Sequence, residues 1–279
     1  ARRVLLAVSG RKPSAIRALQ PLLAQPGMIS LGGGMPNPAS FPIADMHVLL
    51  KTGEVLKLGV ETTAQALQYS STLGLPQLVE HLSALQLREH RPPHDTAQNL
   101  RLLVTTGSQD ALSKSFEMLL SPQDTLLMEW PSYSGALAFL EPLGCHLATT
   151  KTDAEGIIPE ELAGLLENWE SSPSGQRGAP KPRVLYTIPT GSNPTGVSLS
   201  VERKAAIYNI ARRHQMIILE DDPYYYIQFN ETAARTPSFL SLDTDGRVLR
   251  FDSLSKLMSS GLRLGFATGP CNARQPGTG

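Results

Sequence analysis

The segment MIILEDDPYYY, residues 216–226, indicates the fold of this chain more strongly than any other stretch. It begins with a run of apolar residues of strand length, and Glu220, Asp221 and Asp222 follow that run directly. Strands that helices cover on both faces have near-continuous apolar runs of this kind, whereas half-exposed strands alternate apolar and polar residues. We therefore predict a central strand of a parallel sheet at residues 216–220, with carboxylates at its end.

Six further runs of strand length recur along the chain, separated by longer stretches with helical periodicity. They are residues 102–106, 125–129, 146–150, 184–188, 248–252 and 264–268. Two helical patterns cover residues 110–120 and 201–214, and Ser200 is a suitable N-cap for the second. Alternation of strands and helices is typical of α/β domains. The sequence thus predicts an α/β fold with one mostly parallel, seven-stranded sheet flanked by helices.

Composition excludes several classes of function. Lys and Arg total 25 and Asp and Glu total 25, so no net charge favours binding to nucleic acid. No apolar run approaches the roughly 20 residues that a membrane span needs, and we expect no membrane partner. Cys145 and Cys271 lack the spacing of a metal site and are too few for a disulfide framework, so we expect no metal.

The two ends of the chain differ from its middle. No acidic residue precedes Asp45, and the basic residues there give a composition typical of mitochondrial transit peptides or, equally, of a basic arm that folds over an active site. We expect residues 1–45 to form an amino-terminal arm, residues 46–269 a large domain, and residues 270–279 an unstructured tail. Residues 170–182, ESSPSGQRGAPKP, predict an exposed mobile loop.

Polar residues follow several of the predicted strands, at the edge of the sheet where α/β proteins bind ligands. Ser108 and Gln109 follow Gly107 and open a helix, whose free N–H groups would suit a phosphate, although Gly-Ser is also ordinary helix capping. The turn PTGSNPTG at residues 189–196 presents Asn193, which could instead satisfy only its own turn.

Charged residues follow the next two strands. Carboxylates at the end of the 216–220 strand, Asp222 among them, require a cation or hydrogen-bond donor as partner, and a pyridinium nitrogen would be one. The segment 253–263 supplies Lys256 as an amine for imine chemistry, and Arg263 with serine hydroxyls for a phosphate dianion. A lone lysine in such a loop would otherwise be a solvated surface residue.

Taken in order, these segments resemble a known family. SNPTG at residues 192–196, Asp222 with Tyr225, and Ser253-x-Ser255-Lys256 with Arg263 occur in the order and at the intervals of class I aminotransferases of fold type I. The segments ISLGGGMPNP at 29–38, ALQYS at 66–70 and DDPYY at 221–225 resemble the kynurenine/α-aminoadipate aminotransferase branch. The resemblance extends from about residue 14 to residue 270, and it implies the large domain of an aspartate-aminotransferase-like, pyridoxal-phosphate-dependent transferase.

The resemblance also implies a role for each matching residue. Lys256 would bind the cofactor, pyridoxal 5′-phosphate, through an imine and then move the substrate proton. Asp222 would pair with the ring nitrogen, Asn193 and Tyr225 would bind the ring hydroxyl, and Tyr133 would stack on the ring. The implied phosphate ligands are Ser108, Gln109, Ser253, Ser255 and Arg263, together with Tyr69 from a neighbouring subunit. The implied substrate-side residues are Arg17, Gly34 and Asn193.

The implied function is transfer of an amino group from an amino acid of the kynurenine or 2-aminoadipate class to a 2-oxo acid such as 2-oxoglutarate. A homodimer in the mitochondrial matrix or the cytoplasm is implied as well. The chain departs from the family in lacking the small carboxyl-terminal domain, which would carry the arginine that binds the substrate carboxylate. Two alternatives stay open: a catalytically silent, truncated isoform that binds the cofactor or a full-length partner, and a cysteine-conjugate β-lyase on the same scaffold.

Overall fold

The computed structural model describes residues 22, 25–29, 34–229 and 235–271, and the chain divides into two compact units. The smaller unit is Ser9–Thr72. Its described elements are the 3₁₀ helix η1 (Pro38–Ser40), the strands β1 (His47–Leu49) and β2 (Val55–Lys57), and the helix α4 (Val60–Leu67). The two strands form an antiparallel hairpin, and Gln68 Nε2 donates to the carbonyl of Pro36 at 2.9 Å.

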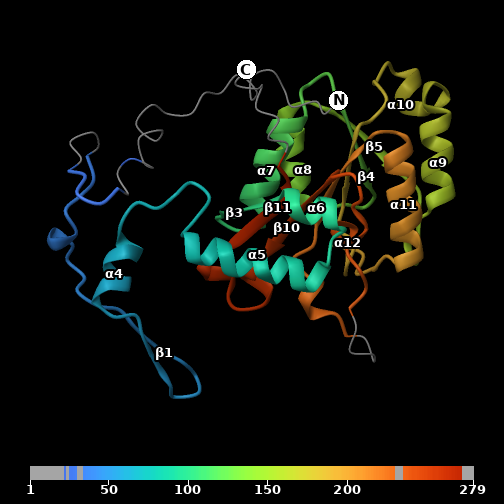
Figure 1. Ribbon diagram of the computed structural model, residues 1–279. Helices are drawn as coiled ribbons and strands as arrows, with labels where there is room; N and C mark the ends of the chain where they lie inside the picture. The colour runs from blue at the N-terminus through green and yellow to red at the C-terminus, as the bar shows by residue number, and fades with distance from the viewer. Residues whose placement is uncertain (1–21, 23–24, 30–33, 230–234, 272–279) are drawn as a thin grey trace. The chain divides into compact units, whose positions relative to one another are not determined.

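The larger unit contains Leu73–Gly279 and is an α/β structure (Figure 1). Its strands are β3 (Leu100–Thr105), β4 (Thr125–Glu129), β5 (His146–Thr150), β6 (Thr152–Asp153), β7 (Gly156–Ile157), β8 (Val184–Thr187), β9 (Ile217–Asp221), β10 (Val248–Ser253) and β11 (Gly265–Pro270). Its α-helices are α5 (Pro76–His90), α6 (His94–Asn99), α7 (Ser108–Leu119), α8 (Ser134–Leu143), α9 (Pro159–Glu167), α10 (Pro173–Gln176), α11 (Val201–Arg213) and α12 (Phe239–Leu242). Short 3₁₀ helices are η2 (Trp169–Ser171), η3 (Tyr225–Ile227), η4 (Leu254–Lys256) and η5 (Ser260–Leu262).

Seven of these strands form one sheet in the order β3-β11-β10-β9-β8-β4-β5. Every neighbouring pair is parallel except for the two pairs that β11 makes, which are antiparallel. The predicted α/β fold with a mostly parallel, seven-stranded sheet is therefore confirmed, and each predicted strand overlaps one strand of this sheet. The predicted cap is also present, because the Ser200 hydroxyl accepts from the backbone N–H of Arg203 at 3.2 Å.

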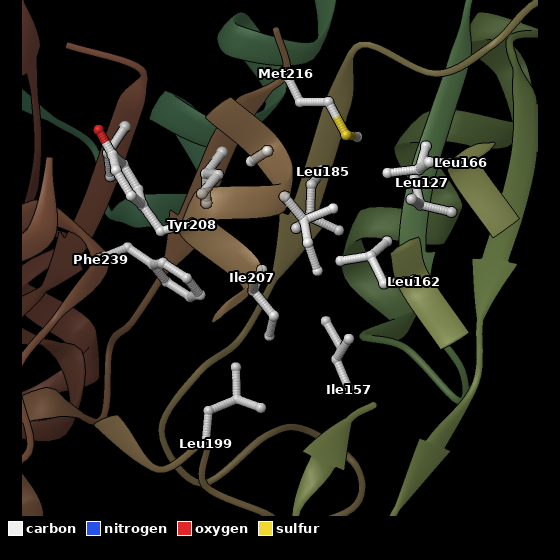
Figure 2. Packing of buried hydrophobic residues seen from close by; sticks show 14 of the residues in the cluster. Leu127, Ile157, Leu162, Leu166, Leu185, Leu199, Ile207, Tyr208, Met216 and Phe239 are labelled. Carbon is white, nitrogen blue, oxygen red and sulfur yellow. The ribbon is translucent and has the colours of Figure 1, made fainter. Parts of the chain in front are cut away.

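Helices cover both faces of the sheet because successive strand residues point to opposite sides. In β4, Leu126 and Met128 pack in the cluster that contains residues of α7 and α8, whereas Leu127 packs with residues of α9 and α11. Figure 2 shows the second cluster, in which Leu127, Leu162 and Leu185 lie close together. These buried contacts hold the strand ends, and hence the loops that follow them, in fixed positions.

The segment 170–182 is mostly exposed, as its composition predicts, but it is not an irregular loop. It contains η2 and α10, and the side chain of Ser172 caps α10 by accepting from Gly175 N. The indole Nε1 of the buried Trp169 donates to the carbonyl of Ala179 at 2.8 Å, which ties the start of the segment to its end. The composition does not predict this local structure, because Gly, Ser and Pro content does not reveal a hydrogen bond between residues ten positions apart.

The carboxyl-terminal strand β11 runs to Pro270, which is in register with Leu100 of β3. Residues 272–279 of the predicted tail lie outside the described residues. Within the described ranges, no helix combines the length and the apolar character that crossing a membrane requires.

Candidate functional site

The carboxyl ends of the parallel strands lie at one edge of the sheet, and the predicted site residues follow those ends. Strands β3 and β10 both run antiparallel to β11, so they point in the same direction. The register sets Thr105, Gly265 and Ser253 side by side at this edge. The sheet order therefore brings loops together that are up to about 150 positions apart in the chain.

Two glycines allow a close approach of backbone at the start of α7. Gly107 has φ of +82°, and a Cβ added there would lie 2.5 Å from Nη2 of Arg263. A Cβ added to Gly265 would lie 2.6 Å from the backbone nitrogen of Ser108 and 2.8 Å from the carbonyl oxygen of Asp252. The guanidinium thus lies directly beside the first turn of α7, where backbone N–H groups and the helix dipole favour an anion.

Two serines contact the same guanidinium, one through its hydroxyl and one through its backbone carbonyl. Arg263 Nη1 donates to the Ser255 hydroxyl at 3.2 Å and to the carbonyl of Ser260 at 2.8 Å. Ser253, and not Ser255, is the residue that caps the next helical turn, because its hydroxyl accepts from the Ser255 N–H at 3.2 Å. Arg263, Ser255 and Ser108 are therefore close enough in the fold to bind one phosphate-sized anion.

Gln109 and Tyr133 meet at Gly135, at the start of α8. Gln109 Nε2 donates to the Gly135 carbonyl at 3.1 Å. The Tyr133 ring packs against the same glycine so tightly that an added Cβ would lie 2.5 Å from its Cζ atom. The aromatic ring predicted to stack on the cofactor thus packs on the same glycine that Gln109, in the first turn of α7, contacts.

Lys256 ends η4 and is exposed. Its Nζ lies 6.0 Å from the centre of the Tyr224 ring, and Tyr224 Cβ in turn lies 3.9 Å from the Cβ position of Gly191. Asn193 follows in a turn closed by a 2.7 Å hydrogen bond from Ser192 N to the carbonyl of Val197. Tyr224 therefore connects the loop of Lys256 with the turn of Asn193.

Asp222 has one bound and one free carboxylate oxygen. The residue is fully buried, and its Oδ2 accepts from Thr190 Oγ1 at 3.1 Å and from Arg250 Nη1 at 3.3 Å. Its Oδ1 is also buried and has no hydrogen-bond partner among the described residues. Burial raises the pKa of Asp222, and the charge of Arg250 opposes this rise. A buried oxygen without a partner is unfavourable by about 1–3 kcal/mol, so Oδ1 is suited to accept from a ligand N–H group.

The region around Asp222 holds more buried carboxylates than buried cations. The carboxylates are those of Glu220, Asp221, Asp222 and Asp252, and the cations are Arg250 and Lys204. Arg250 contacts three of the four carboxylates, while Lys204 Nζ donates to the carbonyl of Pro237 at 3.0 Å. Burial raises the pKa of Asp221 to about 7. A cationic ligand group would offset the remaining negative charge.

Tyr225 is buried, and its ring is close to both Arg250 and His90. The guanidinium carbon of Arg250 is 4.7 Å from the ring centre, and the His90 ring centre is 4.6 Å away. Tyr225 begins η3, directly after the turn that contains Asp222. The two residues predicted to contact the cofactor ring at its nitrogen and its hydroxyl are therefore held next to each other.

Sequence reasoning missed Thr190 and Arg250. Thr190 lies in the turn that was already selected for Asn193, but nothing in that turn singles out its hydroxyl. Arg250 does leave a signal, because an arginine inside the apolar run 248–252 lies on the same side of the strand as Asp252, two residues on. A buried arginine requires such a partner.

Three predicted residues are not among the described residues of the larger unit. Arg17 is outside the described residues, and Gly34 and Tyr69 belong to the unit Ser9–Thr72. The roles predicted for all three stay predictions.

Comparison with known proteins assigns the family. The chain matches the family described as Aminotransferase class I and II over residues 45–275, which is most of its length. The chain belongs to this aminotransferase family. Two mitochondrial kynurenine/alpha-aminoadipate aminotransferases resemble this chain: that of Rattus norvegicus is 46% identical over 275 residues, and that of Bos taurus is 44% identical over 276. These alignments cover 96% and 97% of the chain and 64% of each relative.

Solved structures agree with this assignment. Aminotransferase Aro8 from Candida albicans superposes with a TM-score of 0.84 at 30% identity, covering 96% of this chain and 62% of Aro8. Kynurenine aminotransferase from Pyrococcus horikoshii, solved in complex with PMP, gives a TM-score of 0.67 at 28% identity, covering 95% and 61% of the two chains. The chain thus spans less than two thirds of the length of these relatives.

Class I aminotransferases depend on pyridoxal phosphate, and the candidate site of this chain fits that group at both ends. Arg263, beside the first turn of α7, matches the charge of a phosphate. The free Oδ1 of Asp222, in a region with excess negative charge, matches a protonated ring nitrogen. The fit rests on two observations of this structure. Asp222 Oδ1 is a buried acceptor without a partner among the described residues, and the Arg263 guanidinium lies close to Gly107, at the start of α7.

Proposed function

We propose that this chain binds pyridoxal phosphate and transfers an amino group from an amino acid of the kynurenine or 2-aminoadipate class to a 2-oxo acid such as 2-oxoglutarate. One observation carries the proposal: Asp222, directly after β9, has a buried oxygen without a partner among the described residues, and Arg263 lies beside the start of α7 at the same edge of the sheet. The names of the curated relatives support the substrate class and favour a transaminase over the silent protein or the β-lyase.

Each site residue has one task in the proposed reaction. Bound pyridoxal phosphate supplies a ring that accepts the electron pair left when the Cα–H bond of the amino acid breaks. Asp222 keeps the ring nitrogen protonated, and Asn193 and Tyr225 donate to the ring hydroxyl. Lys256 holds the cofactor and then moves the proton at the substrate Cα. Tyr133 stacks on the ring, and the phosphate ligands are Ser108, Gln109, Ser253, Ser255 and Arg263.

The proposal extends to assembly and location. Tyr69 would reach the phosphate of a second copy in a homodimer, and its 75% exposure in the smaller unit is compatible with that role. Gly34 and Arg17 would lie on the substrate side. The mitochondrial relatives and the basic, acid-free composition of residues 1–44 support the mitochondrial matrix over the cytoplasm.

The test uses the 279-residue chain and the same chain completed with the carboxyl-terminal segment of the rat relative. Each protein is incubated with pyridoxal phosphate, kynurenine or 2-aminoadipate, and 2-oxoglutarate, and glutamate is measured. We expect a visible absorption band from bound cofactor and production of glutamate by the completed protein.

The matched variants are Lys256→Ala and Lys151→Ala. Lys151 is also an exposed lysine and pairs with Glu161 at 3.0 Å, but it follows the edge strand β5, four strands from β10 in the sheet. Lys256→Ala should lose both the band and glutamate production, while Lys151→Ala should keep both. A band without glutamate in the completed protein would favour the silent alternative, and pyruvate from a cysteine conjugate in place of glutamate would favour the β-lyase.

A further inference from the structure

Arg250 is a buried arginine in the middle of a central strand, and it contacts three carboxylates. Its Nε and Nη2 donate to both oxygens of Asp252, at 3.0 and 2.9 Å. Its Nη1 lies 3.2 Å from Glu220 Oε1 and 3.3 Å from Asp222 Oδ2. The side chain has no exposed surface. The bidentate pair with Asp252 fixes the plane of the guanidinium, and this plane fixes the direction in which Nη1 points.

The contact with Asp222 is selective for one oxygen. Nη1 and the Thr190 hydroxyl both donate to Oδ2, and neither bonds to Oδ1. Two donors on one oxygen set the rotation of the carboxylate and leave the other oxygen for a ligand. The nearby positive charge also favours the ionised form of a carboxylate whose burial favours the neutral form.

The central carbon of the same guanidinium lies over the Tyr225 ring, 4.7 Å from the ring centre. Cation–π contacts at this distance stabilise the ring in one orientation. We infer that Arg250 is a positioning residue for the cofactor ring, because a single side chain holds both Asp222 at the ring nitrogen and Tyr225 at the ring hydroxyl. The inference rests on the proposed function, and it adds a residue that does not touch the cofactor.

A purely structural role for Arg250 predicts a different outcome. In that case Arg250 would only hold β9, β10 and Tyr225 together. Removing any other buried cation of the region would then affect protonation of the ring nitrogen equally. Lys204 offers the comparison, because it is also buried, lies on α11, and donates to Pro237 rather than to Asp222. Lys204→Met is therefore the matched control for Arg250→Met, and Arg250→Lys keeps the charge but loses the bidentate fork and the planar face.

The experiment measures protonation of the ring nitrogen by NMR in protein loaded with pyridoxal phosphate carrying ¹⁵N at that position. We expect a protonated nitrogen in the wild type and in Lys204→Met, and loss of protonation in Arg250→Met. In Arg250→Lys, the protonated fraction of the ring nitrogen should lie between those of the wild type and Arg250→Met. In the completed protein, kcat should fall about 10- to 100-fold in Arg250→Met, the effect of one charge-assisted hydrogen bond, with KM for the amino acid changed less than about threefold.

Retained protonation in folded Arg250→Met would overturn the inference, and so would an equal loss in Lys204→Met. If the Arg250 variants do not fold, Thr190→Val decides, because it removes the other donor to Oδ2 with little change in shape. We expect Thr190→Val to keep the nitrogen protonated, and loss of the proton there would assign the positioning to Thr190. Failure of the proposed function is distinct, since the wild type itself would then show no bound cofactor.

Discussion

Replacing Asp221 by Asn tests whether the buried carboxylates at the sheet edge oppose folding at neutral pH. Asp221 is buried, and its Oδ2 accepts from the Tyr186 hydroxyl at 2.9 Å. Burial raises its pKa from 3.8 to about 7, the Tyr186 hydrogen bond lowers it, and the charges of Asp222 and Asp252 raise it further. Asn keeps an oxygen that can accept from Tyr186 and cannot ionise.

The sign of the effect follows from proton linkage. Because the folded pKa lies above the unfolded value, the folded chain binds more protons between pH 4 and 7. The contribution of Asp221 to stability is therefore fully present below pH 4 and is lost as the pH rises through 7. A pKa difference of about 3, at about 1.4 kcal/mol for each pKa unit, gives a loss on the order of 4 kcal/mol.

Urea unfolding of the chain without cofactor, at several pH values from 4 to 8.5, measures this loss. The free energy of unfolding of Asp221→Asn, relative to wild type, should rise by a few kcal/mol across this range. Asp153→Asn is the control, because the hydrogen bond from Arg203 holds the pKa of the exposed Asp153 at about 2. The difference in the free energy of unfolding between Asp153→Asn and wild type should therefore not change with pH above pH 5. Parallel curves for wild type and Asp221→Asn would refute the reasoning.

Three further substitutions test the fold and the anion site. Gly265→Ala places a methyl group 2.6 Å from backbone atoms of Gly107 and Ser108, so it should lower the free energy of unfolding by at least about 1–3 kcal/mol in urea. Leu185→Ala empties a fully buried position (Figure 2) and should lower the same quantity by about 2–5 kcal/mol, with a normal absorption spectrum where folded protein remains. Gly107→Ala should weaken pyridoxal phosphate binding about tenfold in a fluorescence titration, because the methyl group displaces a guanidinium that forms a charge-assisted contact with phosphate.

Local features of the chain were readable from the sequence. Each strand of the main sheet overlaps an apolar run that predicts it, and the Ser200 cap was recognised from its position before a helical pattern. Both signals depend on residues within a few positions of one another, since side-chain periodicity and capping are local. The family resemblance added roles for Lys256, Asp222 and Arg263, because a motif specifies which residue type stands at each strand end.

Long-range features were decided only by the tertiary structure. Strand order places β11 between β3 and β10 and reverses its direction, and only this arrangement brings Gly265 against Gly107. The hydrogen bond between Trp169 and Ala179 folds a segment whose composition predicts a loop. Asp222 was recognised as a carboxylate at a strand end, but its bound and free oxygens depend on Thr190 and Arg250, 32 and 28 positions away. Such pairings follow from the packing of segments that are far apart in the chain. The residues next to a given position in the sequence do not reveal which distant residue it will contact.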